Sequence, residues 1–479
     1  MKILFVNPPR FDNIPVTREE RCELIDRYSI LEPASLLQMA SILRDKGYEV
    51  FLIDANGQNL SYAELEAKMR QIPYDILIFR FCATCFDWDM KTAEISKKIN
   101  KKSTTIGRCF TLTNFEKEMM PEAPDMDIYI RNEFEFVTPL VVAALAEGKS
   151  ISNIEGIAYQ NNNELHINEL AKRSLDFDSF PIPAYDLLPD LKNYFINTPG
   201  GKPFALIVSS SGCPYKCKFC NLSGKPWRMK SPDRVIEELR YLKTNFNIKT
   251  VTFFDECFTI DRNRVIKICE TIYKEKMNIR WYCNSRVNLV DEELVQIMKR
   301  GGCRGIAFGI ESGSQKVLDN ANKGITVKQS EKAIKLLRKY GIKSYCSFVM
   351  GLPGETEETV KETIKFLKDV LPTGAQFNCA VPQPNTELLN IAIKNGWMTE
   401  ELNWRELFEF KSIMRNDSMT TEQIEQARMS AYRSLYTNPR WYIQNVGHVI
   451  RNPEDFMLAS RHAIKILNNF YIKKMKYSH

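Results

Sequence analysis

Short apolar runs and helix-spaced apolar residues alternate along the first 150 residues of the chain. Lys2–Asn7 (KILFVN) is an apolar run that ends at Pro8 and Pro9, which is typical of a buried parallel strand followed by a turn. Glu32–Lys46 carries apolar residues at helical spacing and stops at Gly47, a residue type that commonly ends helices. Four further strands are expected, at Tyr48–Ile53, Asp75–Phe81, Ser103–Ile106 and Asp127–Ile130. Strands separated by helices in this way predict an open, doubly wound α/β sheet over residues 1–150.

Residues 203–390 repeat one unit, an apolar strand that is usually followed by an amphipathic helix. The helical spacing is clear in Asp233–Thr244 and in Ser330–Tyr340. The six expected strands are Phe204–Ser209, Thr250–Phe254, Ile279–Cys283, Gly305–Ile310, Ile342–Met350 and Gly374–Ala380. Repeated strand–helix units of this size curl into a barrel or part of one, with the chemistry at the carboxyl ends of the strands.

The remaining segments are a connector and a helical C-terminal region. In residues 151–202, Ile151–Glu164 suggests a short hairpin, and the prolines of Phe180–Tyr185 exclude a helix. In residues 391–479, Thr420–Leu435 has the spacing of an amphipathic helix. Asn452–Tyr477 mixes apolar and basic residues, so it either lies on a membrane surface or docks on its own protein. Three aromatic residues are candidates for a substrate entrance or for the core: Trp404, Phe408 and Phe410.

Three cysteines, Cys213, Cys217 and Cys220, lie within ten residues with the spacing C-x-x-x-C-x-x-C. Three thiolates on one loop can bind three irons of a [4Fe–4S] cluster and leave the fourth iron open to another molecule. A structural zinc site is the main alternative, but it wants four ligands, and the next cysteine along the chain is Cys257. A disulfide is a weaker alternative, because the motif has three cysteines and pairing two of them leaves one over.

Composition narrows the class of protein. Hydrophobic residues make up 44% of the 479 residues and charged residues 26%, as in ordinary soluble proteins with two or three domains. The net charge of +7 is too small to indicate nucleic-acid binding. No apolar run reaches the length of a transmembrane segment, and the first strand begins at Lys2 without a signal peptide. Thirteen cysteines then indicate a reducing compartment, so we expect a cytoplasmic protein.

The cysteine motif, with Phe219 before its last cysteine, and the six strand–helix units resemble the radical S-adenosylmethionine (SAM) superfamily. The resemblance implies an open, partial (β/α)6 TIM-like barrel. It also implies that Cys213, Cys217 and Cys220 hold a [4Fe–4S] cluster whose open iron binds SAM. Reductive cleavage of SAM would give a 5′-deoxyadenosyl radical, with the electron supplied by a flavodoxin- or ferredoxin-type donor.

Polar residues at the ends of three barrel strands are the positions that this resemblance assigns to SAM. Asp255 and Glu256 would hold its amino group, or they would serve as carboxylates at a helix N-terminus. Arg286 would pair with its carboxylate, or form an exposed salt bridge. Glu311 would accept hydrogen bonds from the ribose hydroxyls. Phe348–Gly354 would pack on adenine or only close the barrel.

The first 150 residues resemble the Rossmann-like cobalamin-binding domain that precedes the barrel in many radical SAM enzymes. The likeness covers the opening strand with its double proline, the helix and strand of Glu32–Asp54, and the turn Cys82–Thr84. It implies cobalamin contacts at the strand ends, at Pro8, Pro9, Thr84, Gly107 and Glu133.

The chain also departs from that domain at two strand ends. Arg108 stands where the family often has a second glycine, and Arg131–Glu135 replaces a glycine-rich turn, so a scaffold domain without cobalamin is the alternative. No histidine precedes His166, so any cobalamin held here would lack a histidine from this domain on its cobalt.

Together the resemblances imply a cobalamin-dependent radical SAM enzyme. We expect a C-methyltransferase that acts on an unactivated carbon of an organic substrate, which the sequence does not identify. One SAM would supply the methyl group through cobalamin, and a second would be cleaved at the cluster. Two alternatives stay open: a radical SAM enzyme of the same layout that closes rings, rearranges or dehydrates, and a non-enzymatic iron–sulfur regulatory protein.

Overall fold

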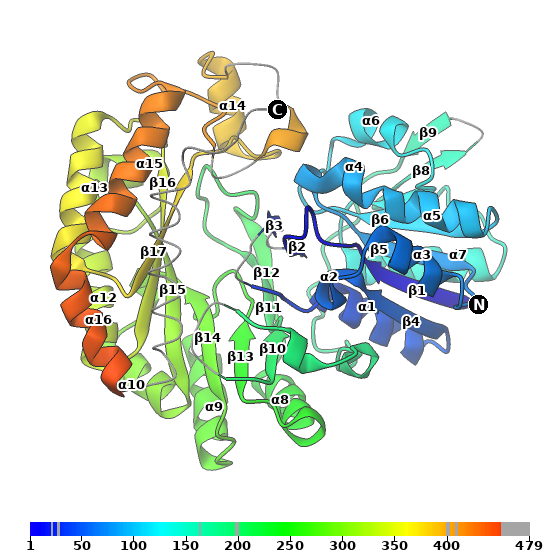
Figure 1. Cartoon of the computed structure of the whole chain (residues 1–479), viewed down its shortest axis with the longest axis horizontal. Helices are drawn as coiled ribbons and strands as arrows, with labels where there is room; N and C mark the ends of the chain where they lie inside the picture. The colour runs from blue at the N-terminus through cyan, green and yellow to red at the C-terminus, as the bar shows by residue number, and fades with distance from the viewer. Residues whose placement is uncertain are drawn as a thin grey trace.

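A computed structural model of the chain describes residues 1–20, 23–25, 29–161, 164–196, 201–398, 403–407 and 411–451. The predicted basic C-terminal stretch and the aromatic candidates Phe408 and Phe410 lie outside these residues. The chain forms two large sheets, with the N-terminal sheet on the right of Figure 1 and the second sheet on the left. A narrow antiparallel hairpin, β11 (Ser210–Cys213) and β12 (Lys225–Met229), lies between them.

The first sheet has the strand order β4-β1-β5-β6-β7-β8-β9. Its first five strands run parallel: β4 (Glu49–Asp54), β1 (Lys2–Asn7), β5 (Ile76–Arg80), β6 (Thr104–Arg108) and β7 (Ile128–Ile130). All five predicted strands are confirmed, with ends that move by two residues at most. The winding direction changes between β1 and β5, and sheets of this kind bind ligands beyond the carboxyl ends of the strands at such a point.

Helices cover both faces of the first sheet. Ile3 and Phe5 of β1 pack on one face with residues of α1 and α7, whereas Leu4 and Val6 pack on the other face with residues of α3 and α5. The helices of this half are α1 (Ala34–Asp45), α2 (Ala55–Gln58), α3 (Tyr62–Met69), α4 (Phe86–Asp89), α5 (Lys91–Ile99), α6 (Glu116–Met119) and α7 (Phe134–Ala146). Successive side chains of β1 thus point to opposite faces of the sheet, and helices bury both faces, as in the predicted doubly wound architecture.

Two hairpins complete this half. β8 (Ile157–Asn161) and β9 (Glu164–Ile167) form the hairpin expected in the connector, but they pair with β7 and extend the first sheet. A second hairpin, β2 (Val16–Arg18) and β3 (Glu23–Ile25), was not predicted. Its strands have three residues each, too few for an alternating pattern to be recognised.

The second sheet has six parallel strands in chain order, and its outer strands do not pair with each other. They are β10 (Phe204–Ile207), β13 (Thr250–Phe253), β14 (Arg280–Ser285), β15 (Cys303–Glu311), β16 (Lys343–Met350) and β17 (Gly374–Cys379). Its helices are α8 (Pro232–Phe246), α9 (Arg262–Lys274), α10 (Glu292–Arg300), α11 (Gln315–Asn320), α12 (Val327–Lys339) and α13 (Glu357–Val370). The predicted partial barrel of six strand–helix units is therefore confirmed.

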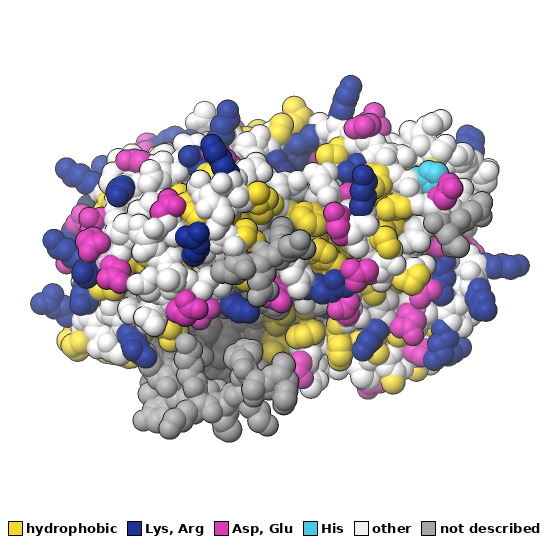
Figure 2. Space-filling model, turned by 90° about the horizontal axis from the view of Figure 1, so that it is seen from above, with side chains coloured by type: hydrophobic (Ala, Val, Ile, Leu, Met, Phe, Trp, Pro, Cys, Tyr) yellow, Lys and Arg dark blue, Asp and Glu magenta, His cyan; other side chains and the backbone are white. Residues whose placement is uncertain are grey.

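The chain beyond β17 returns to both halves. It forms α14 (Glu387–Lys394), the 3₁₀ turn η6 (Trp404–Glu406), α15 (Thr421–Tyr436) and α16 (Pro439–Arg451). Trp404 is buried in the core of the first sheet rather than at an open entrance. Among the described helices, none combines the length and the apolar character needed to cross a bilayer. On the face shown in Figure 2, basic and acidic side chains are intermingled, and apolar side chains gather near the middle.

Candidate active site

The three cysteines of the motif lie on a loop that follows the first strand of the second sheet. β11 and β12 hold the two ends of this loop together, with Cys213 opposite Lys225. Gly212 has a φ of +95°, and a Cβ at this position would lie 2.4 Å from the carbonyl oxygen of Pro226. Only glycine fits there, so the shape of the loop depends on a residue within the motif itself.

The thiols of this loop lie close enough to influence one another's ionisation. The pKa of Cys220 is raised to about 11, mainly by burial and further by the charges of Cys217 and Cys213. Burial and Cys217 also raise the pKa of Cys213, whereas the positive charge of Arg286 lowers it. One guanidinium nitrogen of Arg286 lies 3.8 Å from the sulfur of Cys217. A cation beside grouped thiols favours the thiolate form that binds metal.

The number of donors on this loop fits an iron–sulfur cluster. A structural zinc ion binds four ligands around one centre, whereas the motif supplies three thiols. In a [4Fe–4S] cluster each thiolate binds its own iron atom, and the sulfurs need only border a common space. The twelve cysteines that the structure describes are free thiols, which also leaves the disulfide alternative without support there.

Arg286 is buried beside the thiols and does not form an exposed salt bridge. Its side chain stacks on the ring of Tyr215 at 3.7 Å and donates a hydrogen bond to the carbonyl of Lys323. Its Nε has no hydrogen-bond partner among the described residues. A buried guanidinium with a spare donor is suited to bind a carboxylate.

Asp255 and Glu256 follow β13, and the structure separates their roles. The Asp255 carboxylate is fully buried and accepts hydrogen bonds from the Ser209 amide at 2.7 Å and from the hydroxyls of Ser209 and Ser210 at 2.6 and 2.7 Å. It therefore fixes the chain between β10 and β11. Glu256 lines the central cavity described below. Neither residue caps the following helix, because Asp261 does so.

Glu311 ends β15 in the left-handed conformation, with a φ of +67°, at a point where the ladder to β16 is irregular. Its carboxylate accepts a hydrogen bond from the Lys323 ammonium at 2.6 Å, and both side chains are buried. A Cβ at Gly309 would lie 2.4 Å from this carboxylate, so glycine makes room for the pair. Backbone strain and bulges of this kind concentrate at functional sites.

The predicted stretch Phe348–Gly354 contributes mainly to the barrel core. Phe348 and Met350 are fully buried and belong to the large apolar cluster of the second sheet. This burial favours the simpler of the two interpretations, in which the stretch closes the barrel.

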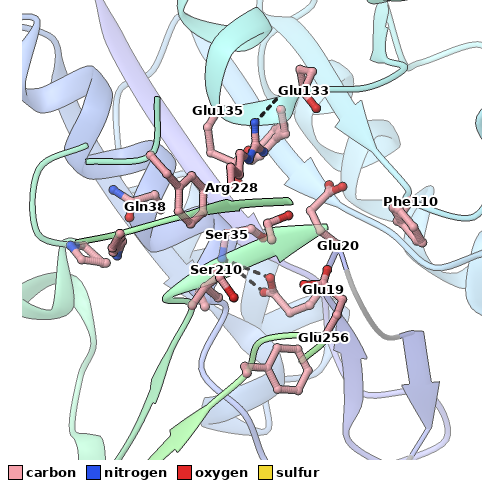
Figure 3. A pocket seen from close by; sticks show the side chains of 18 of the residues that line it. Glu19, Glu20, Ser35, Gln38, Phe110, Glu133, Glu135, Ser210, Arg228 and Glu256 are labelled. Carbon is pink, nitrogen blue, oxygen red and sulfur yellow. Dashed lines mark hydrogen bonds and ion pairs between the residues drawn. The ribbon is translucent and has the colours of Figure 1, made fainter. Parts of the chain in front are cut away.

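One cavity lies between the two sheets, at the carboxyl ends of their strands (Figure 3). Arg108 and Glu133 border it from the ends of β6 and β7, and Ser210 and Glu256 border it from beyond β10 and β13. The space between its lining atoms measures about 970 Å³, part of which is open to solvent. Clefts at the carboxyl ends of strands are the usual ligand sites of α/β proteins.

Ion pairs from both halves meet across this cavity. Glu133 adopts a φ of +49° and accepts hydrogen bonds from Arg173 at 3.0 Å and from Arg228 at 2.6 Å. Arg228 belongs to β12, next to the cysteine loop, so this pair joins the first sheet to that loop (Figure 3). Glu133 thus lies at the cavity, as predicted, but as part of an ion-pair network.

Burial raises the pKa of two other carboxyl groups of the cavity. The pKa of Glu19 rises to about 7, although Arg80 and hydrogen bonds from Ser35 oppose the shift. The pKa of Glu135 is raised as well, against the effect of Arg228. Burial therefore opposes the charged form of both groups.

The other positions predicted to contact cobalamin do not line this cavity. Arg18 of β2 covers Pro8 and Pro9, because its guanidinium donates to their carbonyls at 3.1 and 2.9 Å. The same guanidinium forms a buried ion pair with Asp89 at 2.7 Å. The unpredicted hairpin therefore lies over the end of β1.

Thr84 and Gly107 lie in similarly occupied surroundings. The hydroxyl of Thr84 lies 2.9 Å from the sulfur of Cys82. A Cβ at Gly107 would lie 2.2 Å from the sulfur of Met126, so this glycine allows close core packing. Beside them, the carboxylate of Glu23 accepts the backbone N–H groups of Ala83, Phe110 and Thr111 at 3.1, 3.1 and 3.2 Å.

Sequence reasoning missed several residues of the site. Tyr215 stands inside the cysteine motif, and Lys225 and Arg228 follow it within eight residues of Cys220, so proximity to the motif was an available signal. Lys323 precedes Gly324, and nothing local connects it with Glu311, twelve residues earlier. Only the tertiary structure shows that pair.

Comparison with known proteins gives a consistent result. The sequence model of the radical SAM superfamily matches residues 207–367, which contain the cysteine motif. An uncharacterized methyltransferase of Pyrococcus horikoshii is 34% identical over 417 residues, covering 86% of this chain and 90% of that protein. An anaerobic magnesium-protoporphyrin IX monomethyl ester cyclase of Rubrivivax gelatinosus is 28% identical over 415 residues, or 85% of this chain and 74% of the cyclase.

Among solved structures, the cobalamin-dependent SAM radical enzyme OxsB, with aqua-cobalamin and SAM bound, superposes with a TM-score of 0.73 at 18% identity. The match covers 99% of this chain and 72% of OxsB, so the likeness of fold extends over both sheets. A family model that matches the region of the cysteine motif, a relative of 34% identity over most of its length, and a similar two-sheet fold lead to one assignment. This chain is a member of the radical SAM superfamily.

Proposed function

We propose that this protein is a cobalamin-dependent radical SAM enzyme that methylates an unactivated carbon of an organic substrate. The observation that carries the proposal is the group of three mutually close thiols, Cys213, Cys217 and Cys220, with the buried Arg286 beside them. The P. horikoshii relative, described as a methyltransferase, supports the reaction type.

The three thiols would hold a [4Fe–4S] cluster, and the groups around them would position SAM. Arg286, through its spare Nε, would bind the SAM carboxylate, and Glu256 would face its amino group. Glu311, fixed by Lys323, would accept from the ribose hydroxyls. Cluster and SAM together supply a 5′-deoxyadenosyl radical. The chain's own part is to orient SAM and to keep water away from the radical.

The central cavity is where cobalamin would be held. Its position beyond the strand ends of a doubly wound sheet fits a cofactor site. OxsB, which has a similar fold and has aqua-cobalamin bound, supports cobalamin as the cofactor. Of the five contacts predicted from the sequence, Glu133 borders this space. Bound cobalamin supplies a carrier for the methyl group.

A non-methylating radical reaction is the second candidate, and the relatives are the reason to keep it. The R. gelatinosus cyclase aligns over 85% of this chain. Such an enzyme would still cleave SAM reductively, but it would not need to transfer a methyl group.

The products of SAM decide between these proposals. The protein is reconstituted anaerobically with iron, sulfide and hydroxocobalamin and then incubated with SAM and dithionite. We expect 5′-deoxyadenosine together with cobalamin-dependent S-adenosylhomocysteine. Formation of 5′-deoxyadenosine without S-adenosylhomocysteine selects the second candidate. If neither product forms, both enzymatic proposals are wrong, and the regulatory alternative gains support.

We further propose a flavodoxin- or ferredoxin-type protein as the physiological electron donor, since such a reaction needs a one-electron reductant. A reducing, anaerobic cytoplasm is the proposed setting, supported by the twelve free thiols in the described part of the chain. Replacement of dithionite by reduced flavodoxin tests the donor, with 5′-deoxyadenosine as the readout.

A further inference from the structure

Lys225 lines the central cavity and has an unusual environment for a lysine. Its ammonium group lies over the ring of Phe110, 4.6 Å from the ring centre. Within the described residues it forms no ion pair. A cation–π contact replaces only part of the hydration that a lysine loses in a cleft, so an anion beside it would be favourable.

Two arginines share the carboxylate of Glu20, and one of them, Arg108, lines the cavity together with Glu20. Glu20 accepts hydrogen bonds from Arg80 at 2.6 Å and from Arg108 at 2.8 Å. Arg80 is 1% exposed, and its Nε and Nη2 have no hydrogen-bond partner among the described residues. Buried polar groups are nearly always satisfied, so unused guanidinium donors of this kind need an explanation.

The local charge balance points in the same direction. Five cations line the cavity, Arg108, Arg173, Lys225, Arg228 and Lys230, together with five carboxyl groups, Glu19, Glu20, Glu133, Glu135 and Glu256. Burial raises the pKa of Glu19 and of Glu135, which opposes the charged form of these two carboxyl groups. Compensation of the cations by the lining carboxyl groups is therefore weakened.

We propose that the substrate carries an oxyanion, a carboxylate or phosphate group, which binds to Lys225 and to the Arg80–Glu20–Arg108 group. The side chain of Glu20 is 30% exposed, whereas those of Arg80 and Arg108 are 1% and 3% exposed. Of these three residues, Glu20 is thus the one that a ligand can reach and displace. Until a ligand binds, its carboxylate forms the ion pairs with Arg80 and Arg108. This inference rests on the proposed function, because it places the substrate in the central cavity beside the cobalamin that the cavity would hold.

The test is calorimetric titration of inorganic phosphate, and separately of acetate, into the reconstituted holoprotein that carries cluster, SAM and hydroxocobalamin. We expect the wild type to bind at least one of these probes. Lys225→Met should weaken that binding about tenfold, since a charge-assisted contact is lost. Lys225→Arg should restore binding of the probe.

Glu20→Gln should strengthen binding of the probe about tenfold, because the competing carboxylate is gone. Lys328→Met, an exposed lysine on α12, is the matched control and should change nothing.

The opposite signs expected for the two variants make the proposal easy to contradict. Absence of binding to the wild type, or equal binding by Lys225→Met, would overturn it. If phosphate binds only before cobalamin is added and Lys225→Met weakens cobalamin binding, the oxyanion belongs to the cofactor, and the proposal is wrong. If phosphate binds only before SAM is added and Lys225→Met weakens SAM binding, the oxyanion belongs to SAM, and the proposal is also wrong. Iron content of each variant shows that the cluster loop is intact. Deoxyadenosine formation, measured in parallel, tests the proposed function separately from this binding.

Discussion

At the residue scale, Cys217 and Cys257 form a matched pair of buried cysteines, 6% and 2% exposed. Cys217 lies beside Arg286, whereas the sulfur of Cys257 lies 3.9 Å from the hydroxyl of Thr259. We expect Cys217→Ala to lose most of its bound iron. Its rate of SAM cleavage should fall by more than about 100-fold, a larger loss than is typical when a residue next to a metal ligand is changed. Cys257→Ala should keep both. Iron and sulfide analysis under anaerobic conditions checks this, and equal iron loss in the two variants would disprove the three-cysteine assignment.

Glu355 gives a prediction about pH. Its side chain is fully buried and accepts the backbone N–H of Gly351, and burial raises the pKa of this carboxyl from 4.5 to about 7. Between these two values the unfolded chain binds fewer protons than the folded one, so folding stability falls as pH rises. Glu355→Gln removes the titrating group and therefore this loss. The difference in folding stability between the variant and the wild type should increase in favour of the variant by about 3 kcal/mol from pH 4 to pH 8.

Chemical denaturation of both proteins across that pH range measures the effect. Glu358→Gln, an exposed position in the first turn of the following helix α13, is the control and should shift stability by no more than about 0.5 kcal/mol. A wild-type protein whose stability rises from acidic to neutral pH in parallel with Glu355→Gln would contradict the assignment of the raised pKa to Glu355.

At the element scale, the open second sheet must protect two edge strands, β10 and β17. Tyrosine hydroxyls do this on both sides. Tyr185 donates to the carbonyl of Leu206 on β10 at 3.1 Å. Tyr436 of α15 accepts from the N–H of Ala375 on β17 and donates to the carbonyl of the same residue, both at 3.0 Å. Helix α15 therefore completes the barrel edge as well as packing on it.

Tyr436→Phe should leave the two backbone groups of Ala375 without a partner. We expect a loss of about 1–3 kcal/mol in folding stability and faster amide exchange at Ala375. Tyr273→Phe is the control, because Tyr273 is 58% exposed. Unchanged exchange at Ala375 in Tyr436→Phe would show that water or another group satisfies this edge equally well.

The elements differ in how well the sequence predicted them. Strands buried on both faces, such as Lys2–Asn7, were located within two residues because their apolar runs are local and continuous. The β2–β3 hairpin was missed because its stability comes from ion pairs with Asp89, Arg80 and Arg108, which are 60 to 88 residues away in the chain. The proposed domain boundaries stay predictions.

The candidate site shows the same division. The cysteines, Arg286 and Glu256 were selected because they follow strand ends, which converge in this fold. The structure places Arg286 beside Cys217 and Glu256 at the cavity, and the roles of these residues stay predictions. Asp255 has the same kind of position, but its carboxylate is used by Ser209 and Ser210. Position along the chain predicts which residues reach the site, whereas the direction of each side chain depends on tertiary neighbours.

At the scale of the whole molecule, contacts on several sides of the cavity hold the two sheets together. They include Glu133 with Arg228, Phe110 with Lys225, Asn114 with Asn385, and Arg405 with Asp87 and Glu122. The last two pairs join the first sheet to the chain that follows β17. The geometry of the cavity therefore depends on segments from the beginning, middle and end of the described chain.

Trp404 is an apolar contact of this kind, and it supplies the last prediction. It is 5% exposed, meets the ring of Phe86 edge-on at 4.8 Å, and carries the guanidinium of Arg405 over its own ring at 4.1 Å. Trp404→Ala should cost about 3–5 kcal/mol through the cavity it leaves. Because the lost contact joins the two halves, hydrogen exchange should increase in the first sheet and in the cavity-facing ends of the second.

Trp441→Ala is the matched control for this variant. Trp441 is 9% exposed but packs on Tyr436 and donates to the carbonyl of Pro372, both within the second half. Its removal should increase exchange near β17 and leave the first sheet unchanged. If Trp404→Ala behaved like Trp441→Ala, with exchange increased in one half alone, the returning chain would not couple the two sheets. The cavity would then depend on the contacts around Glu133 and Lys225 alone, which would make those residues its main structural determinants.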